Sequence, residues 1–171
     1  MELFWERLST KHDRESFESG TPELDFYLKN QAGQDRRRNL ASIFVLTEDT
    51  GNIVGYYALS QDAITAEELP DDTSKKLPMT RKIPCTLLGR LAVDTRYRGQ
   101  GYGRELLYNA LNRAATMSLE IASFAVIVDA KNAQAKEFYK RHNFLEFKNQ
   151  PLRLFIPIIL IQKMVKQWKS Q

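Results

Sequence analysis

The chain has 171 residues, 43% of them hydrophobic and 27% charged, with a formal net charge of +4 and a sequence pI of about 9.2. This composition predicts one soluble domain over residues 1–171, and no apolar run is long enough to span a membrane. The N-terminus lacks the layout of a signal peptide, and one cysteine, Cys85, excludes an internal disulfide, so a reducing cytoplasm is the expected compartment.

The first half of the chain contains strand, helix and hairpin signals. A threonine–proline pair followed by apolar residues at helical spacing predicts one helix over residues 22–36. Residues 49–52 form a turn signal between two β-rich runs, which predicts an antiparallel hairpin. Residues 65–84 are polar and contain prolines, so a long loop with a helical turn is expected, and it could cover a substrate site. The strands expected in this half are 4–7, 42–47 and 53–59.

The second half alternates strands and helices. Strands are expected at 86–93, 124–128, 144–147 and 152–156, and helices at 101–116, 132–142 and 159–168. This order predicts a mixed α/β (α+β) fold in which helices pack on a largely antiparallel sheet.

The segment from Arg98 to Gly103 reads Arg-Gly-Gln-Gly-Tyr-Gly and lies between a predicted strand and a predicted helix. Glycines at alternate positions allow a tight bend, and a helix N-terminus adds unpaired N–H donors, so the segment suits a pyrophosphate. Arg96, Arg98 and Arg104 could add positive charge. The spacing fits neither the dinucleotide fingerprint nor the P-loop, and a glycine-rich turn without a ligand remains the alternative.

Two stretches carry a resemblance to the GNAT superfamily of acetyltransferases. Leu88–Gly103 resembles its core motif, (Arg/Gln)-x-x-Gly-x-(Gly/Ala) after a strand. Asn132–Phe144 is similar to its Asn-x-x-Ala-x-x-Phe-Tyr-x-x-x-Gly-Phe signature, with Asn143 in place of the glycine. Asparagine is the non-glycine residue best suited to a left-handed helix end, so this departure is compatible with the fold.

The resemblance implies the GNAT fold, in which a central, mostly antiparallel sheet is splayed at the cofactor strand and carries helices on both faces. It also implies acetyl-CoA as the cofactor, with its pantetheine arm on the strand backbone and its pyrophosphate on the glycine-rich loop. The cofactor contacts implied are Leu91, Ala92, Val93, Arg98, Gly99, Gln100, Gly101, Tyr102, Gly103, Arg104 and Asn132.

Tyr139 matches the superfamily tyrosine that lies next to the thioester sulfur. A phenol can donate a proton to the departing thiolate, so Tyr139 is the candidate general acid, with packing beside Phe138 as the alternative. Neither His12 nor His142 is a convincing general base, and a water or an already neutral amine could suffice. Cys85 has no visible relay and is expected in the core, and no metal site is expected.

Several stretches resemble the GNAT toxins of bacterial type II toxin–antitoxin pairs. That similarity implies acetylation of the α-amine of aminoacyl-tRNA, which would block translation. It also implies a ribbon-helix-helix antitoxin as partner and a homodimer, to which exposed apolar residues such as Trp168 could contribute. The stretches that carry it are Phe17–Gly20, Leu24–Leu28, Ala32, Ser42–Leu46, Val54–Leu59, Leu88–Asp94 and Arg153–Pro157.

Basic residues are the candidates for tRNA contacts. Arg36, Arg37 and Arg38 are consecutive and could bind phosphates, although a solvated face is the alternative. Arg90 is expected on the strand face opposite Leu91, either toward a substrate cleft or in a structural salt bridge. Two other functions remain open: acetylation of a small amine, polyamine or protein amine, and a non-catalytic acyl-CoA-binding module.

Overall fold

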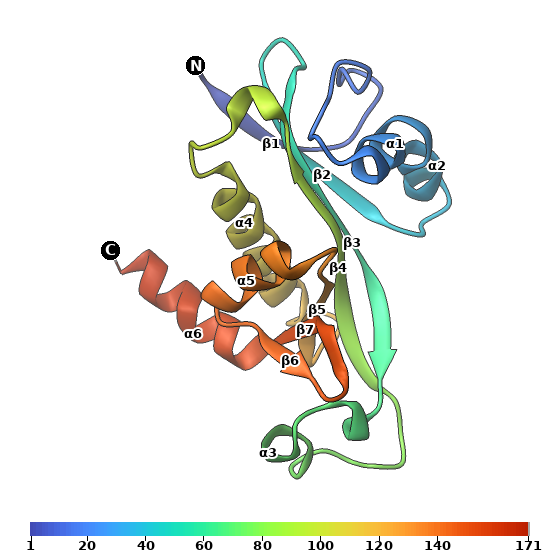
Figure 1. Cartoon of the computed structure of the whole chain (residues 1–171), viewed down its shortest axis with the longest axis vertical. Helices are drawn as coiled ribbons and strands as arrows, with labels where there is room; N and C mark the ends of the chain where they lie inside the picture. The colour runs from blue at the N-terminus through green and yellow to red at the C-terminus, as the bar shows by residue number, and fades with distance from the viewer. Residues whose placement is uncertain (171) are drawn as a thin grey trace. The chain divides into compact units, whose positions relative to one another are not determined.

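The computed structural model describes residues 1–170. Its seven strands form one sheet in the order β1-β2-β3-β4-β5-β7-β6, parallel at β4/β5 and antiparallel at β1/β2, β2/β3, β5/β7 and β6/β7 (Figure 1). This arrangement confirms the predicted mixed α/β fold. The elements are β1 (Leu3–Arg7), α1 (Pro22–Asn30), α2 (Ala32–Arg37), β2 (Ser42–Glu48), β3 (Ile53–Ile64), the 3-10 helix η1 (Ala66–Glu68), α3 (Asp71–Ser74), β4 (Ile83–Val93), the 3-10 helix η2 (Thr95–Tyr97), α4 (Tyr102–Met117), β5 (Ala125–Asp129), α5 (Ala133–Arg141), β6 (Leu145–Phe147), β7 (Gln150–Pro157) and α6 (Ile158–Lys169).

The chain divides into two compact units. The first comprises residues 1–60 and 88–110, and the second comprises residues 61–87 and the chain from residue 111 onward. That residues 1–171 form a single domain stays a prediction. Among residues 1–170, no helix is long and apolar enough to cross a membrane.

The first unit contains a meander of β1, β2 and β3 with side chains alternating between its faces. One face packs against α1 and α2 through a cluster that includes Phe17, Leu28, Ile43, Val45 and Tyr56. The other face carries an aromatic group in which the Tyr57 ring lies 5.3 Å from that of Phe44 and 6.3 Å from that of Trp5. The Tyr57 hydroxyl donates to Asn109 of α4, so the meander is covered on both faces.

The second unit has β5 and β7 at its centre, paired so that Ile127 lies opposite Phe155. These two side chains belong to a buried cluster with Leu69, Phe147 and Cys85. The helices α5 and α6 contact β7 (Figure 1). Cys85 therefore lies in the core, as predicted from the sequence. Burial raises the pKa of its thiol to about 12.

Three elements differ from the sequence predictions. The helix expected over 22–36 is broken at Gln31, where φ is −121°, and α2 is turned so that Asp35 accepts a hydrogen bond from the Tyr27 hydroxyl at 2.8 Å. Strand β3 continues five residues past the predicted end because Ile64 is buried in the second core cluster. Strand β4 begins at Ile83, three residues earlier than expected, and its second residue is the exposed Pro84.

The left-handed conformation expected at Asn143 is confirmed, since its φ is 74°. Asparagine adopts this conformation more readily than most residues with a side chain. Asparagine therefore provides the left-handed conformation at the end of α5 that the motif glycine would provide.

Candidate functional site

The glycine-rich loop connects η2 to α4. Gly99 and Gly101 adopt positive φ angles of 73° and 86°, which only glycine adopts without strain. A Cβ atom built at either position would have no atom within 4 Å, so the space beside this backbone is open. Gly103 instead lies in the first turn of α4, so two of the three glycines form the bend and the third belongs to the helix.

Backbone donors are available along this loop. Within residues 1–170, the N–H groups of Gly99, Gln100, Gly101 and Tyr102 donate no hydrogen bond to the protein. The first helical bond here runs from the Glu105 N–H to the Gly101 carbonyl at 3.2 Å. Free donors next to the N-terminus of a 16-residue helix favour an anion. The residues present therefore fit a pyrophosphate group.

The arginines around the loop have protein partners. Arg98 donates through Nη2 to the Ser19 carbonyl at 2.6 Å, and Arg96 donates through Nε to Asp94 at 2.9 Å. The Arg104 guanidinium lies 4.9 Å from the centre of the Tyr108 ring. From the sequence, Arg96 and Arg98 are expected to add charge around a pyrophosphate. Their contacts do not support this role, because both side chains bond other parts of the protein.

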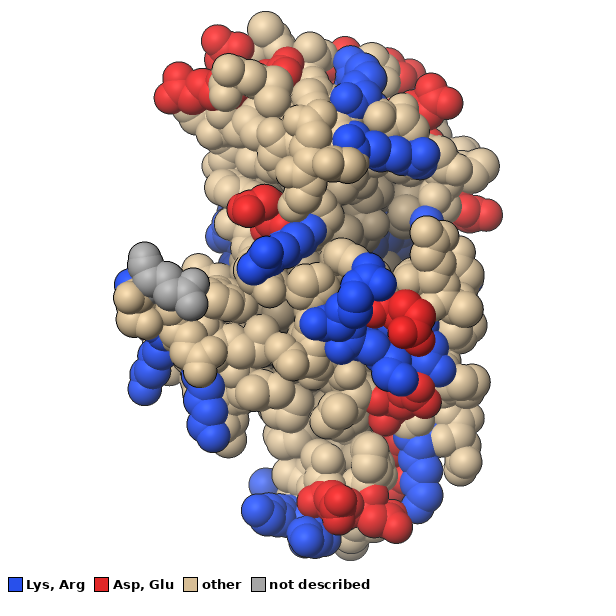
Figure 2. All heavy atoms as spheres, turned by 60° about the vertical axis from the view of Figure 1, so that its left-hand side comes forward, with Lys and Arg blue, Asp and Glu red and all other residues tan. Residues whose placement is uncertain are grey.

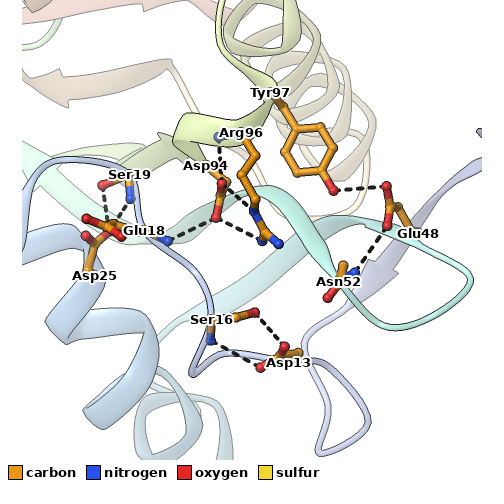
Figure 3. A network of polar contacts seen from close by, with 10 residues as sticks. All are labelled: Asp13, Ser16, Glu18, Ser19, Asp25, Glu48, Asn52, Asp94, Arg96 and Tyr97. Carbon is orange, nitrogen blue, oxygen red and sulfur yellow. Dashed lines mark hydrogen bonds and ion pairs between the residues drawn. The ribbon is translucent and has the colours of Figure 1, made fainter.

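Asp94 is the centre of this polar network (Figure 3). Its carboxylate, 1% exposed, accepts from the Glu18 N–H at 3.0 Å and from the Arg96 N–H at 2.8 Å. Burial alone would raise the pKa of Asp94, but the hydrogen bonds from Arg96 and Glu18 outweigh burial and lower the pKa. No sequence pattern assigned a role to Asp94, although an aspartate directly after a strand is a typical cap for a following turn, and Asp94 caps η2.

A second side of the network fixes η2. The Tyr97 hydroxyl donates to Glu48 at 2.9 Å, and Asn52 donates to the other oxygen of the same carboxylate at 3.3 Å (Figure 3). The turn that leads into the loop is therefore attached both to residues 18–19 and to the β2–β3 hairpin.

The strand residues expected to contact the pantetheine arm lie at the end of β4. Ala92 is buried in the first core cluster, whereas Leu91 and Val93 are half-buried. The Asp94 N–H donates to the Val54 carbonyl at 2.9 Å, which continues the contact between β4 and β3. The backbone before the loop is thus held in place by its neighbouring strand.

Arg90 lies flat on an aromatic ring. Its guanidinium carbon is 3.6 Å from the centre of the Tyr27 ring, a cation–π contact, and the Tyr27 hydroxyl is fixed by Asp35. Among residues 1–170 Arg90 forms no ion pair. Within the described residues Arg90 therefore does not form the structural salt bridge considered from the sequence, and its guanidinium contacts Tyr27 instead.

Arg36, Arg37 and Arg38 end α2 with exposed side chains. On the face of the molecule drawn in Figure 2, Lys and Arg side chains form several groups with Asp and Glu between them. The small positive net charge is therefore distributed over this face, and charge alone does not single out one binding surface there.

Asn132 and Tyr139 belong to the second unit. Asn132 caps α5, with its Oδ1 accepting from the Ala135 N–H at 2.8 Å. Tyr139 is half-buried and its ring contacts Phe138 and Phe144 at centroid distances of 5.2 and 5.3 Å. Burial raises the pKa of Tyr139 to about 12, so the phenol keeps its proton at neutral pH. Within residues 1–170 its hydroxyl has no hydrogen-bond partner and can donate to a substrate.

The histidines do not provide an obvious base. His12 is 5% exposed, its Nδ1 accepts from the Ser9 N–H at 3.0 Å, and burial lowers its pKa. His142 packs its ring 5.0 Å from that of Phe138 at the end of α5. His12 is thus a buried neutral side chain, and His142 is a packing residue.

Comparisons with known proteins agree with this geometry. The model of the Acetyltransferase (GNAT) family matches residues 3–144. A tRNA-acetylating toxin of Mycobacterium tuberculosis (strain ATCC 25618 / H37Rv) is 33% identical over 150 residues, covering 88% of this chain and 89% of that protein. A probable toxin TacT of Sinorhizobium fredii (strain NBRC 101917 / NGR234) is 30% identical over 163 residues, covering 91% and 90%.

Solved structures are similar over nearly the whole chain. AtaT complexed with acetyl-methionyl-tRNAfMet has a TM-score of 0.88 and 28% identity, covering 96% of this chain and 99% of that one. A tyrosine-to-phenylalanine mutant of AtaT, bound to the C-terminus of the antitoxin AtaR and acetyl-CoA, has a TM-score of 0.82 and 26% identity, covering 95% and 98%.

The Asp94 network generates a stability prediction. Asp94→Asn should lower the free energy of unfolding by about 2 kcal/mol, because the amide keeps one acceptor oxygen and its NH2 cannot accept from the donors that face the other oxygen. Urea unfolding at pH 7 measures the change. The matched control is Asp13→Asn. The Asp13 carboxylate is exposed and accepts from Ser16, so this substitution should cost about 0.5 kcal/mol or less.

The same substitution should alter the pH dependence of stability. Because the pKa of Asp94 is lowered on folding, its stabilisation is full above the unfolded pKa of about 3.9 and is lost as pH falls through the folded value. The difference in the free energy of unfolding between wild type and Asp94→Asn should therefore become smaller below about pH 4. A difference that is the same at acid and neutral pH would contradict this role for Asp94.

Proposed function

Because the chain belongs to the Acetyltransferase (GNAT) family, we propose that it is an acetyl-CoA-dependent N-acetyltransferase that acetylates the α-amine of aminoacyl-tRNA and thereby blocks translation. The observation that carries the proposal is the 33% identity to a tRNA-acetylating toxin over 88% of this chain and 89% of that protein. The similarity to AtaT complexed with acetyl-methionyl-tRNAfMet supports the same acceptor class.

The glycine-rich loop is the proposed pyrophosphate site of acetyl-CoA, which supplies the acetyl group as a thioester. Its open backbone at Gly99 and Gly101 and its free N–H donors support this role. Arg98 contributes as part of the loop backbone, since its side chain is bonded to Ser19. The other cofactor contacts proposed are Leu91, Ala92, Val93, Gln100, Tyr102, Gly103, Arg104 and Asn132.

Tyr139 is the proposed general acid. The neutral amine attacks the acetyl carbonyl carbon, the carbon–sulfur bond breaks, and Tyr139 donates its hydroxyl proton to the sulfur. The nitrogen loses one proton as the amide forms, which restores the proton balance. The raised pKa and the free hydroxyl of Tyr139 support this assignment, because the phenol is protonated whenever a substrate arrives.

The proposed acceptor residues are Arg36, Arg37, Arg38 and Arg90. The three exposed arginines at the end of α2 are suited to phosphates, and Arg90 is held rigidly on Tyr27. The α-amine of an aminoacyl ester is less basic than a lysine amine, so much of it is neutral at pH 7. This property agrees with the lack of a convincing basic side chain.

The proposal extends to partners, organisation and place of action. AtaT bound to the C-terminus of AtaR supports an antitoxin for this chain as well, and the resemblance to the toxin group favours a ribbon-helix-helix protein and a homodimer. A single domain is supported by the family match to residues 3–144, which draws on both compact units. Charged tRNA as acceptor implies action in the cytoplasm.

The acceptor is tested by incubating the protein with acetyl-CoA and total charged tRNA and analysing the aminoacyl groups by mass spectrometry. We expect one or a few aminoacyl groups to gain 42 mass units, about the mass that acetylation adds to an amine. Acetylation of a polyamine or a protein amine with no change in any charged tRNA would refute the toxin function and retain the transferase activity.

Replacement of the proposed acid should separate chemistry from binding. Tyr139→Phe should lower kcat by about a hundredfold or more, because the donor proton is lost, while the Kd for acetyl-CoA stays unchanged. Tyr57→Phe is the control, since it removes a buried tyrosine hydroxyl that donates to Asn109 within the first unit. Wild-type turnover in Tyr139→Phe would refute the assignment.

Replacement of the arginine run tests the tRNA surface. Gln at Arg36, Arg37 and Arg38 should reduce the slope of log Kd against log salt by about 3, because each phosphate contact releases about one counterion. The control, Gln at Lys163, Lys166 and Lys169, changes the net charge equally on exposed side chains of α6. An equal loss in both triple variants would indicate general charge attraction and would contradict a specific surface on α2.

A further inference from the structure

The glycine-rich loop is attached to the N-terminal segment by a side-chain-to-backbone hydrogen bond. Arg98, at the start of the loop, donates through Nη2 to the Ser19 carbonyl at 2.6 Å, across 79 residues of sequence. The next residue, Gly20, has a φ of 86°, and a Cβ atom there would lie 2.5 Å from Arg98 Nη2. The guanidinium therefore packs directly on the Gly20 backbone, whose positive φ favours glycine.

Ser19 is in turn fixed by helix α1. Its N–H and its hydroxyl both donate to Oδ1 of Asp25, at 2.9 and 2.6 Å, and its side chain is buried (Figure 3). The Ser19 hydroxyl oxygen also accepts from the Thr21 N–H at 3.1 Å. Asp25 thus determines where the Ser19 carbonyl lies, and the carbonyl determines where Arg98 lies.

A second pair of bonds aligns the same segments. The Glu18 N–H donates to Asp94, and the Thr95 N–H donates to the Glu18 carbonyl at 2.8 Å. These bonds end before the loop begins, so the Arg98–Ser19 bond is the last attachment before Gly99 and Gly101. Beyond it the backbone is open on the side where a pyrophosphate would bind.

Helix α1 also supports the proposed acceptor side. Two residues after Asp25, Tyr27 carries the Arg90 guanidinium on its ring and bonds Asp35 of α2. One short helix therefore bears the anchor of the cofactor loop and the platform of Arg90.

We propose that Asp25 and Ser19 are positioning residues that hold the acetyl-CoA loop in its binding conformation through Arg98. The proposal rests on the proposed function, because it takes this loop as the coenzyme A site. Neither residue is among the proposed cofactor contacts. Without Asp25 the Ser19 segment loses its anchor, Arg98 loses a fixed acceptor, and the loop has to be ordered when the ligand binds.

The test is the affinity for coenzyme A, measured by isothermal titration calorimetry with the full chain. Asp25→Ala removes the acceptor for both Ser19 donors and should weaken coenzyme A binding about ten-fold, within the usual range of energetic coupling between sites. Asp25→Asn keeps an oxygen at the same position and should restore binding to within about two-fold of wild type.

The matched control is Asp13→Ala. Asp13 accepts from the N–H and the hydroxyl of Ser16 in the same N-terminal segment (Figure 3). Among residues 1–170 it forms no hydrogen bond with Ser19 or Arg98. Its removal should leave the affinity for coenzyme A within about two-fold of wild type. Arg98→Met keeps the stem and removes the donor, so it tests the same contact if Asp25→Ala does not fold, and it should weaken binding about ten-fold.

The outcomes separate the two proposals. Wild-type affinity in a folded Asp25→Ala or in Arg98→Met overturns the positioning role and leaves the proposed function intact. An equal loss in Asp13→Ala, or no rescue by Asp25→Asn, also overturns it, because the effect would then reflect general loosening or loss of charge. A wild-type protein that does not bind coenzyme A overturns both proposals.

Discussion

The candidate site depends on a buried carboxylate, that of Asp94 at the end of β4. Burying a charge is costly unless hydrogen bonds satisfy it, and here donors from Arg96 and Glu18 do so. Because one of these donors is the backbone of the N-terminal segment, the carboxylate joins that segment to the cofactor strand. The backbone that enters the glycine-rich loop therefore begins from a fixed point.

In this network the side chains fix the position of the loop, and the backbone N–H groups remain available to bind an anion. The side chains of Arg96 and Arg98 each donate within the protein, whereas the free backbone N–H groups of the loop and the dipole of α4 are available to an anion. Backbone donors need a bend that side chains do not obstruct, which Gly99 and Gly101 provide. Rigid surroundings and an open bend are complementary, because a fixed loop loses less entropy when its ligand binds.

Local patterns predicted most elements, the bend at the loop and the left-handed Asn143. What the sequence did not reveal depends on contacts between distant residues. The break at Gln31 accompanies the Tyr27–Asp35 bond. Asp94 and Arg98 bond residues 18 and 19, more than 70 positions away. A sequence shows that an arginine carries a donor, but only the fold decides which acceptor it meets.

The pKa of Tyr139 constrains how the transfer reaction is completed. A phenol with a pKa of about 12 cannot by itself leave its proton on a thiolate, because thiols have a pKa of about 8.5. The positive charge that develops on the attacking nitrogen favours the phenolate and lowers the pKa of Tyr139 as the bond forms. In the proposed mechanism, proton donation from Tyr139 to sulfur then depends on the charge on nitrogen, and proton loss from that nitrogen restores the proton balance. In this mechanism, an acceptor amine that arrives neutral supplies that proton within the reaction, so a histidine or carboxylate base is not required.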